Sequence, residues 1–247
     1  MAACAKHFPG DGVDFRDQHL HPTYNSLPAA QGYATYGAIY RELIGRGLMS
    51  VMVGHIVQPA VAMEINPVLR MEDCLPASLS PELLTGLLRG KLGFNGVITS
   101  DATIMGGYCM AMERSKAIPA SIAAGCGVEV YKPLEDELHG TSALSGRRLT
   151  LYLANYEQAS NQTTVRIDWC KKHALDTPRF LNEEPCVFVS LANPYLLQDV
   201  PRVPTYINAY TASRAVIEAV IGKLLRGGPF EGVSPVDAFC GLPDTRL

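Results

Sequence analysis

The sequence is poor in charge and has no long apolar run. Of its 247 residues 18% are charged, and the formal net charge is −3. A balance this close to neutral provides no broad basic surface, so we expect no nucleic-acid partner. No apolar run approaches the length of a membrane span, and the first residues show no basic segment followed by an apolar stretch. We therefore expect no membrane partner and a cytoplasmic location.

Familiar ligand-binding patterns are also missing. The seven cysteines are scattered, are odd in number and include no C-x-x-C pair, which argues against a disulfide framework and against a zinc knuckle. We interpret them as buried thiols of a reducing compartment. No glycine-rich phosphate loop joins a strand to a helix, and the histidines and acids of the first 21 residues lack a known metal-ligand spacing. We expect neither a metal nor another cofactor.

The first half of the chain alternates short apolar runs with helical patterns. With 47% hydrophobic residues the chain can bury a sizeable core. The spacing of apolar residues predicts strands and helices in turn, at 2–8 (strand), 29–47 (helix), 48–55 (strand), 80–92 (helix), 96–101 (strand), 112–124 (helix) and 127–131 (strand). Such strand-to-helix alternation predicts an α/β fold with a parallel sheet.

Two architectures fit that predicted sheet. Alternation over roughly 130 residues fits a small doubly wound sheet, and it equally fits half of an eight-stranded (β/α)8 barrel, which takes about 250 residues when complete. Both folds place their sites at the carboxyl ends of the strands. The pattern alone therefore leaves the choice open.

The composition changes near Glu135, where a second unit is expected to begin. The segment from His139 to Leu149 is polar and turn-rich, as a linker would be. Three apolar runs, LTLYLAN, TTVRIDW and CVFVSLANP, then predict strands, and an amphipathic helix is expected from about Ser213 to Arg226. We therefore predict two domains, at 1–135 and 136–247.

One carboxylate stands at the end of a predicted buried strand. Asp101 closes the run GVITSD, at the position where α/β folds expose catalytic groups. A carboxylate there suits a nucleophile, a base or a metal ligand. The alternative is that Asp101 only caps the segment that follows.

Three histidines occupy positions that suit chemistry. Asp17 and His19 form a D-x-H pair, and in an extended segment both side chains lie on one side, so the carboxylate can hold one ring nitrogen while the other faces a substrate. That arrangement makes a general acid/base, whereas the alternative is a solvated loop histidine. Lys6 and His7 stand at one strand end and His55 at another, where they could hold hydroxyl groups.

These residues lie in stretches that together resemble one family. The stretches AKHFPGDG with DQH, GLMSVMVGHIVQPA, LPASLSPELLTGLLRGKLGFNGVITSDATIMGG and AIPASIAAGCGVEV occur in the order found in the catalytic domain of glycoside hydrolase family 3. The likeness is to its bacterial β-N-acetylglucosaminidase (β-N-acetylhexosaminidase) branch. The last sixty residues look like the end of that family's second domain, an α/β sandwich.

The resemblance implies a fold and a retaining mechanism. The implied fold is α/β: the C-terminal half, about four βα units, of a (β/α)8 TIM-type barrel, followed by part of an α/β sandwich domain. The Asp of the family's SD motif, here Asp101, is the nucleophile that forms a glycosyl-enzyme intermediate. A loop histidine, here His19, is the general acid/base together with the aspartate two residues before it, here Asp17.

The resemblance also implies a substrate. Lys6 and His7 match the family's sugar-hydroxyl binders, and His55 matches its neighbouring strand-end histidine. The expected activity is removal of terminal β-N-acetylglucosamine from a small carbohydrate. The alternatives are a β-glucosidase of the same family and a non-catalytic truncated remnant.

Two departures from the family pattern bear on that expectation. The family's loop usually reads KHFPGHGD, whereas here Asp11 stands in place of the second histidine and Val13 in place of the aspartate. The Lys-His motif also belongs near the fifth strand of the family's barrel, and this chain begins at that motif. The resemblance therefore implies a truncated or internally deleted relative, whose open sheet edges would favour self-association.

Overall fold

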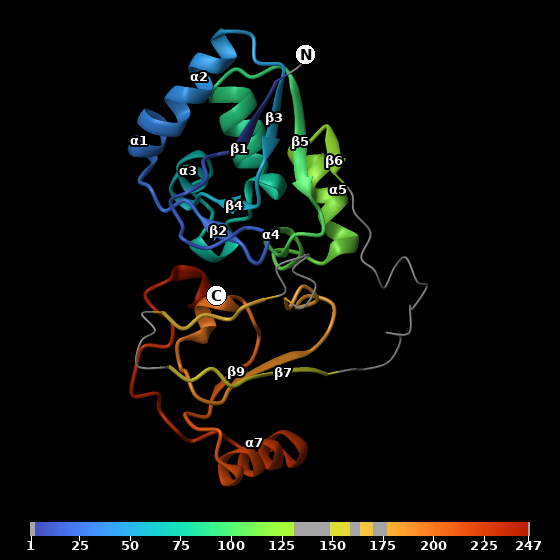
Figure 1. Cartoon of the computed structure of the whole chain (residues 1–247). Helices are drawn as coiled ribbons and strands as arrows, with labels where there is room; N and C mark the ends of the chain where they lie inside the picture. Colours follow the sequence, from blue (N-terminus) through green and yellow to red (C-terminus); the bar gives the residue numbers. More distant parts are fainter. Residues whose placement is uncertain (1–2, 131–148, 159–163, 170–176, 247) are drawn as a thin grey trace. The chain divides into compact units, whose positions relative to one another are not determined.

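The computed structural model describes residues 3–130, 149–158, 164–169 and 177–246 (Figure 1). The chain divides into two compact units, Met1–Ala143 and Leu144–Leu247. The predicted domain boundary at 135, and the predicted linker up to residue 148, lie outside the described residues. Each unit is therefore considered by itself.

The first unit consists of short strands joined by helices. Its elements are β1 (Cys4–Phe8), β2 (Thr23–Tyr24), α1 (Ala29–Gly32), the π-helical η1 (Tyr33–Gly37), α2 (Ala38–Gly45), β3 (Ser50–Val53), β4 (Ile56–Val57), α3 (Pro59–Ile65), the 3₁₀ turns η2 (Met71–Asp73) and η3 (Ala77–Leu79), the π-helical η4 (Glu82–Lys91), β5 (Val97–Ala102), α4 (Gly106–Cys109), α5 (Arg114–Ala124) and β6 (Val128–Val130). The predicted alternation of strands and helices is confirmed.

The main sheet is parallel throughout and has the strand order β1-β3-β5-β6 (Figure 1). The order of the strands in the sheet thus follows their order in the chain. A second, two-stranded sheet pairs Thr23 with Ile56 and Tyr24 with Val57, and so holds the end of the first loop beside the segment that follows β3. The mixed α/β fold with parallel sheets is confirmed.

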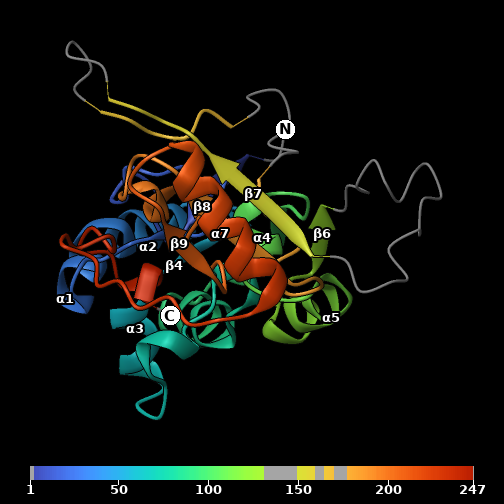
Figure 2. The same cartoon turned by 90° about the horizontal axis from the view of Figure 1, so that it is seen from below.

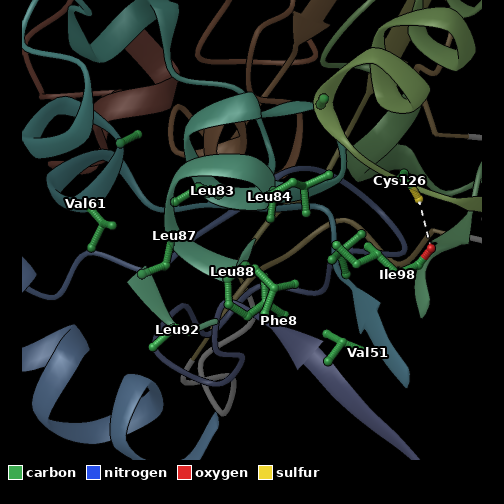
Figure 3. Close-up of a cluster of buried hydrophobic side chains, with 14 of the residues drawn as sticks. Phe8, Val51, Val61, Leu83, Leu84, Leu87, Leu88, Leu92, Ile98 and Cys126 are labelled. Carbon is green, nitrogen blue, oxygen red and sulfur yellow. Dashed lines mark hydrogen bonds between the residues drawn. The ribbon is translucent and has the colours of Figure 1, made fainter. Parts of the chain in front are cut away.

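One face of the main sheet is covered by helices. Figure 3 shows the leucines of η4 pointing toward Phe8 of β1 and Val51 of β3, with Ile98 of β5 beside them. The leucine stripe recurs at helical spacing, so one side of η4 is apolar and packs on the strands, with Leu83, Leu84, Leu87 and Leu88 all buried. This contact forms the core of the unit.

The opposite face of the main sheet is more open. Because side chains alternate along a strand, the residues between the core positions point away from the helices. Val97 is exposed. Met52 and Thr99, which are partners in the pairing of β3 with β5, are half-buried. This second face is therefore less covered than the first.

The predicted start of η4 is confirmed. The hydroxyl of Ser80 accepts a hydrogen bond from the backbone N–H of Leu83, as an N-cap does, and Pro81 precedes the helix. After the helix Gly93 has φ +72°, a backbone conformation that favours glycine. The chain can therefore turn directly into β5.

The second unit contains a three-stranded parallel sheet covered on one face by a helix. Its elements are β7 (Thr150–Ala154), β8 (Cys186–Ser190), the 3₁₀ turn η5 (Leu196–Asp199), β9 (Tyr206–Asn208), α7 (Arg214–Arg226) and the 3₁₀ turn η6 (Pro243–Arg246). Figure 2 shows α7 lying across this sheet, where Val220 packs with Val187 and Val189 of β8. The predicted helix and the strands beginning at 149 and 186 are confirmed.

The strand predicted in the run TTVRIDW is wrong for its described part, because residues 164–169 form no strand. Groups of this segment bind Asp199 instead of a neighbouring strand. Arg166 forms a salt bridge with the Asp199 carboxylate, the N–H of Ile167 donates to its Oδ2 at 3.0 Å, and the indole N–H of Trp169 donates to its carbonyl. Residues 164–169 are thus held by their bonds to Asp199 and not by pairing with a strand.

The six described cysteines are free thiols. Four are buried as expected, but Cys4 and Cys240 are exposed. Among the described helices none is long and apolar enough to cross a membrane.

Candidate functional site

The candidate site lies at the carboxyl ends of three neighbouring strands. His7 is in β1, His55 comes two residues after β3, and Asp101 is in β5. Parallel pairing of these strands brings their carboxyl ends together, as in other α/β folds. Residues separated by almost a hundred positions in the sequence therefore meet.

Asp101 is held by a histidine and by the backbone. Its Oδ2 lies 3.3 Å from Nε2 of His7, and its Oδ1 accepts a hydrogen bond of 2.7 Å from the N–H of Ala102. Burial alone would raise the pKa of Asp101. The bonds from His7 and Ala102 and the charges of His55 and His7 outweigh that effect and lower the pKa to about 2. Asp101 is therefore ionised at neutral pH.

The other ring nitrogen of His7 meets a second carboxylate. Nδ1 of His7 lies 3.1 Å from Oδ2 of Asp11. The same oxygen accepts a hydrogen bond of 3.0 Å from the side-chain amide of Gln18, and Oδ1 of Asp11 accepts one from the N–H of Gly12. The Gln18 amide oxygen in turn accepts a bond of 2.7 Å from the N–H of His55. One polar network thus joins β1, the first loop and the end of β3.

Asp17 and His19 form a closely bound pair on that first loop. Oδ1 of Asp17 lies 2.6 Å from Nδ1 of His19, and the His19 ring is 61% exposed. The hydrogen bond with Asp17 raises the pKa of His19, and the charges of Asp17, Asp101 and Asp11 act in the same direction against the effect of burial. The same hydrogen bond lowers the pKa of Asp17. The dyad combines an exposed ring with a raised pKa.

Two glycines bring the loop close to the segment after Asp101. The N–H of Gly106 donates to the carbonyl of His19 at 2.8 Å, and the N–H of Gly107 donates to the carbonyl of Gln18 at 3.0 Å. A Cβ atom at Gly106 would lie 2.0 Å from the Leu20 carbonyl oxygen. Only glycine permits this approach of backbone to backbone. Gly106 and Gly107 therefore hold the loop that carries Asp17 and His19.

A buried ion pair supports the loop from within. The guanidinium of Arg16 bonds the Asp14 carboxylate at 2.7 Å, and both side chains are almost fully buried. Oδ2 of Asp14 also accepts a hydrogen bond from the N–H of Tyr24 in β2. Burial would raise the pKa of Asp14, but the bonds and the charge of Arg16, with the N–H of Tyr24, lower it overall. The pair ties the loop to the small sheet.

His55 is fully buried, and both its ring nitrogens have protein partners. Nε2 lies 3.2 Å from the carbonyl oxygen of Ala102, which can only accept, so Nε2 carries the proton. Nδ1 then accepts a hydrogen bond of 2.9 Å from the hydroxyl of Ser78. Burial lowers the pKa of His55 to about 4, against the opposing charge of Asp101. His55 is thus neutral at pH 7, and its predicted contact with a sugar stays a prediction.

Lys6 is the remaining predicted site residue, and its side chain is exposed. It lines a cavity of about 270 Å³ together with His7 and Asp11. Helix residues, among them Tyr36 and Ile39, also line this cavity. The hydroxyl of Tyr36 donates to the carbonyl of Asp11 at 2.7 Å. A small polar ligand bound there would meet a cation and two hydrogen-bonding groups.

Several members of this network are not evident from the sequence. Gln18 and Ser78 belong to common polar types without a motif of their own, and only the position of Gln18 inside D-x-H was a signal.

Within the described part of the chain, no cluster of three His, Cys, Asp or Glu side chains is arranged to hold a metal ion. The arrangement provides an ionised carboxylate and an exposed histidine paired with an aspartate. These are the groups needed for nucleophilic and general acid/base chemistry.

Comparison with known families identifies the family of this chain. A model of the glycosyl hydrolase family 3 N terminal domain matches residues 1–145, more than half of the chain. The chain belongs to glycosyl hydrolase family 3. The family predicted from the sequence motifs is therefore confirmed.

Two curated relatives of this family 3 chain are named for glycosidase activities. A beta-N-acetylglucosaminidase/beta-glucosidase of Cellulomonas fimi is 31% identical over 382 residues, with 100% of this chain and 68% of the relative covered. That span exceeds the 247 residues of the chain, so it includes segments of the relative without a counterpart here. A beta-hexosaminidase of Nitrosospira multiformis is 35% identical over 146 residues, covering 56% of this chain and 39% of the relative. The chain thus spans only part of either relative.

A solved structure extends the likeness to both units. The beta-glucoside phosphorylase BglX bound to 2FGlc has a TM-score of 0.54 and 29% sequence identity, covering 98% of this chain and 66% of that chain. NagZ from Neisseria gonorrhoeae in complex with N-trifluoroacetyl-D-glucosamine has a TM-score of 0.44 and 31% identity, covering 57% of this chain and 37% of that chain. The likeness to BglX therefore includes the second unit as well as the first.

Proposed function

We propose that this family 3 chain is a retaining glycosidase that removes terminal β-N-acetylglucosamine. Asp101 is the nucleophile, and Asp17 with His19 is the acid/base dyad. The observation that supports this most directly is the contrast between the two groups: Asp101 has a pKa of about 2, whereas the pKa of His19 is raised by its bond with Asp17. One group is suited to attack as an anion and the other to donate a proton.

In the first step a carboxylate oxygen of Asp101 attacks the anomeric carbon and forms a new C–O bond. The glycosidic C–O bond breaks, and its oxygen leaves with the proton from Nε2 of His19. The bond from Asp17 to Nδ1 stabilises the protonated ring before the transfer. The charge of Asp101 stabilises the oxocarbenium-like transition state.

In the second step the neutral His19 accepts a proton from water. The water oxygen attacks the same carbon and displaces the Asp101 carboxylate, so the product regains the starting configuration. Protons and charges balance over the two steps, and both residues return to their first state. The exposed ring of His19 gives it access to the leaving group and then to water.

Sugar binding is proposed for Lys6, His7 and His55. Lys6 and His7 both line the cavity, where an ammonium and an imidazole can contact hydroxyl oxygens. His55 belongs to the strand end beside them, but a direct contact would require its bonds to Ser78 or Ala102 to open. The names of the relatives from Cellulomonas fimi and Nitrosospira multiformis favour N-acetylhexosamine as the sugar.

Turnover of a chromogenic aryl β-N-acetylglucosaminide tests this function. Asp101→Asn should reduce the rate by about 10³-fold or more, since removal of a nucleophile leaves only binding and acid catalysis. Asp73→Asn is the matched control, because Asp73 is an exposed aspartate whose salt bridge with Arg70 lies on a surface turn. Equal rates for the wild type and Asp101→Asn would refute the enzymatic function.

The corresponding aryl β-glucoside separates the two sugars. The relative of Cellulomonas fimi is named for both activities, which favours β-glucosidase as the alternative within the same mechanism. A higher kcat/KM on the glucoside would assign that alternative. Adding inorganic phosphate to either assay, with sugar phosphate measured as product, would show phosphate replacing water.

A non-catalytic assembly module is the second candidate function. The main sheet follows chain order, and one of its faces is partly open, which supports a partial barrel whose outer strands are β1 and β6. The first unit then represents part of a barrel domain and the second unit part of a sandwich domain. Open strand edges favour pairing with another copy.

Sedimentation velocity over a range of protein concentrations tests this second candidate. Association through open strands predicts that the sedimentation coefficient rises with concentration. A charge placed on the outer strand β6, Val128→Lys, should weaken association, whereas the same change at exposed Val68, which lies in a loop after α3, should not. A compact monomer at every concentration would refute the assembly function without bearing on Asp101.

A further inference from the structure

The most unusual feature of the site is the aspartate at position 11, where the family's loop usually carries a histidine. We propose that Asp11 is a positioning residue, which orients the His7 ring toward the nucleophile and couples it to the loop of the acid/base dyad. The role in catalysis rests on the proposed glycosidase function. The orientation of His7 is a property of the resting protein and can be measured without turnover.

The Asp11 carboxylate receives three donors from the protein, although its side chain is 43% exposed. Oδ2 receives His7 Nδ1 at 3.1 Å and the Gln18 amide at 3.0 Å, while Oδ1 receives the N–H of Gly12 at 3.0 Å. Its backbone carbonyl receives the Tyr36 hydroxyl at 2.7 Å. The side chain is thus held in one orientation, so it can in turn hold the imidazole.

The orientation of the His7 ring follows from the type of each partner. A carboxylate only accepts hydrogen bonds, so the contact with Asp11 places a proton on Nδ1 of His7. That bond turns the opposite ring nitrogen, Nε2, toward Oδ2 of Asp101 at 3.3 Å, and by the same rule Nε2 is the donor in that contact. Without Asp11 the ring would be free to rotate about its bond to Cβ, and the contact with Asp101 would lose its second anchor.

Gln18 extends the same network to the acid/base loop. Its amide N–H₂ donates to Asp11, and its amide oxygen accepts from the N–H of His55. Its backbone carbonyl accepts from Gly107, and the neighbouring residue is His19. Asp11 therefore lies between the residue that contacts the nucleophile and the loop that presents the acid. A histidine side chain has no oxygen and at most one acceptor nitrogen. At position 11 it could not replace Oδ2 of Asp11, which accepts from both His7 and Gln18.

Chemical modification by diethyl pyrocarbonate, followed by peptide mass spectrometry, reads this orientation residue by residue. The reagent acylates an unprotonated imidazole nitrogen that is free to react. Loss of the charged hydrogen bond in Asp11→Ala should raise the rate at His7 by about tenfold. Asp11→Asn should give a smaller rise, because one acceptor oxygen remains. Asp73→Ala is the matched control and should leave the rate unchanged.

The modification of other histidines in the same reaction shows whether the variant is folded. His21 and His55 are buried in the wild type, whereas His19 is exposed. A selective rise at His7, with His21 and His55 still protected, supports the positioning role. An unchanged rate at His7 overturns it. A parallel rise at His21 and His55 also overturns it, because Asp11 would then be needed only to keep the fold.

Kinetics link this orientation to catalysis and separate it from the proposed function. If the wild type turns over an aryl glycoside, Asp11→Asn should lower kcat by about tenfold with KM within about twofold. Asp11→Glu, which keeps the charge, should recover part of kcat. An unchanged kcat overturns the link between orientation and catalysis. A wild type without turnover overturns the proposed glycosidase, while the modification rates still decide whether Asp11 orients His7.

Discussion

Asp17 binds His19 twice through the same oxygen. Its Oδ1 lies 2.6 Å from the ring nitrogen Nδ1 and also accepts the backbone N–H of His19 at 2.9 Å. The first contact sets the proton on Nδ1, and the second keeps the two residues in one local conformation. None of the described residues forms a hydrogen bond with Nε2 of His19, so that atom is available for a substrate.

Asp17→Asn should lower the pKa of His19. The hydrogen bond and charge of Asp17 raise that pKa, so its loss makes the ring deprotonate at a lower pH. Titration of the His19 ring by ¹H–¹³C NMR measures the shift directly. In the active protein the alkaline limb of kcat/KM should move to lower pH as well. The surface variant Asp73→Asn should leave both unchanged, and an unmoved midpoint in Asp17→Asn would contradict the dyad.

His19→Ala should affect substrates according to their leaving group. A poor leaving group needs a proton as the glycosidic bond breaks, whereas an activated nitrophenolate does not. We expect a loss of about 10²-fold or more on an alkyl glycoside and a much smaller loss on a nitrophenyl glycoside. The measurement is kcat/KM on both substrates for the wild type and the variant. An equal loss on both would argue against a role as acid.

Gly106→Ala should displace the acid/base loop. The new Cβ would lie 2.0 Å from the carbonyl oxygen of Leu20, so the loop or the turn must move. Misplacement of a catalytic group by about 1 Å can cost about 10²-fold in rate. The matched control is Gly127→Ala, where the nearest atom to a new Cβ is 3.6 Å away. Similar rates and circular dichroism spectra for both variants would show that the close approach is not required.

Asp14→Asn should destabilise the first unit by about 3 kcal/mol, because it removes the negative charge that meets the Arg16 guanidinium at 2.7 Å in a buried salt bridge. Urea unfolding followed by far-UV circular dichroism measures this loss. The fluorescence of Trp169, the single tryptophan, reports on the second unit and should change little. Asp73→Asn, which breaks an exposed pair, should cost well under about 1 kcal/mol.

The stability from Asp14 should depend on pH with a definite sign. Its folded pKa is lower than the ordinary value of 3.8. The stabilisation is therefore present above pH 3.8 and is lost as the pH falls through the folded pKa. Unfolding free energies measured at neutral and acidic pH should converge between the wild type and Asp14→Asn. A constant difference at every pH would contradict this coupling.

Local patterns were sufficient to predict the four strands of the main sheet and the longer helical segments between them. The leucines of η4, the Ser80 cap and the run that ends at Asp101 are contiguous in sequence, and their periodicity directly reflects burial on one face. The two-residue strands β2 and β4 were missed because so short a pair has no period. The run TTVRIDW was misjudged, since its apolar alternation says nothing about a distant acceptor such as Asp199.

The candidate site could be predicted only in part. Asp101 is recognisable at the end of a strand and His19 in its D-x-H pair, because each signal lies within a few residues. Gln18 could not be identified, since its partners Asp11 and His55 are seven and 37 positions away. Ser78 was missed for the same reason, being 23 positions from His55.

The sequence by itself determined the family, the parallel α/β pattern and the residues able to supply a nucleophile and an acid. The tertiary structure alone decided how they are held: His7 between Asp11 and Asp101, His55 buried against Ser78, and the acid/base loop docked on Gly106. The physical reason is that hydrogen bonds depend on distance and direction in space. Parallel strand pairing brings together groups that are far apart in the chain.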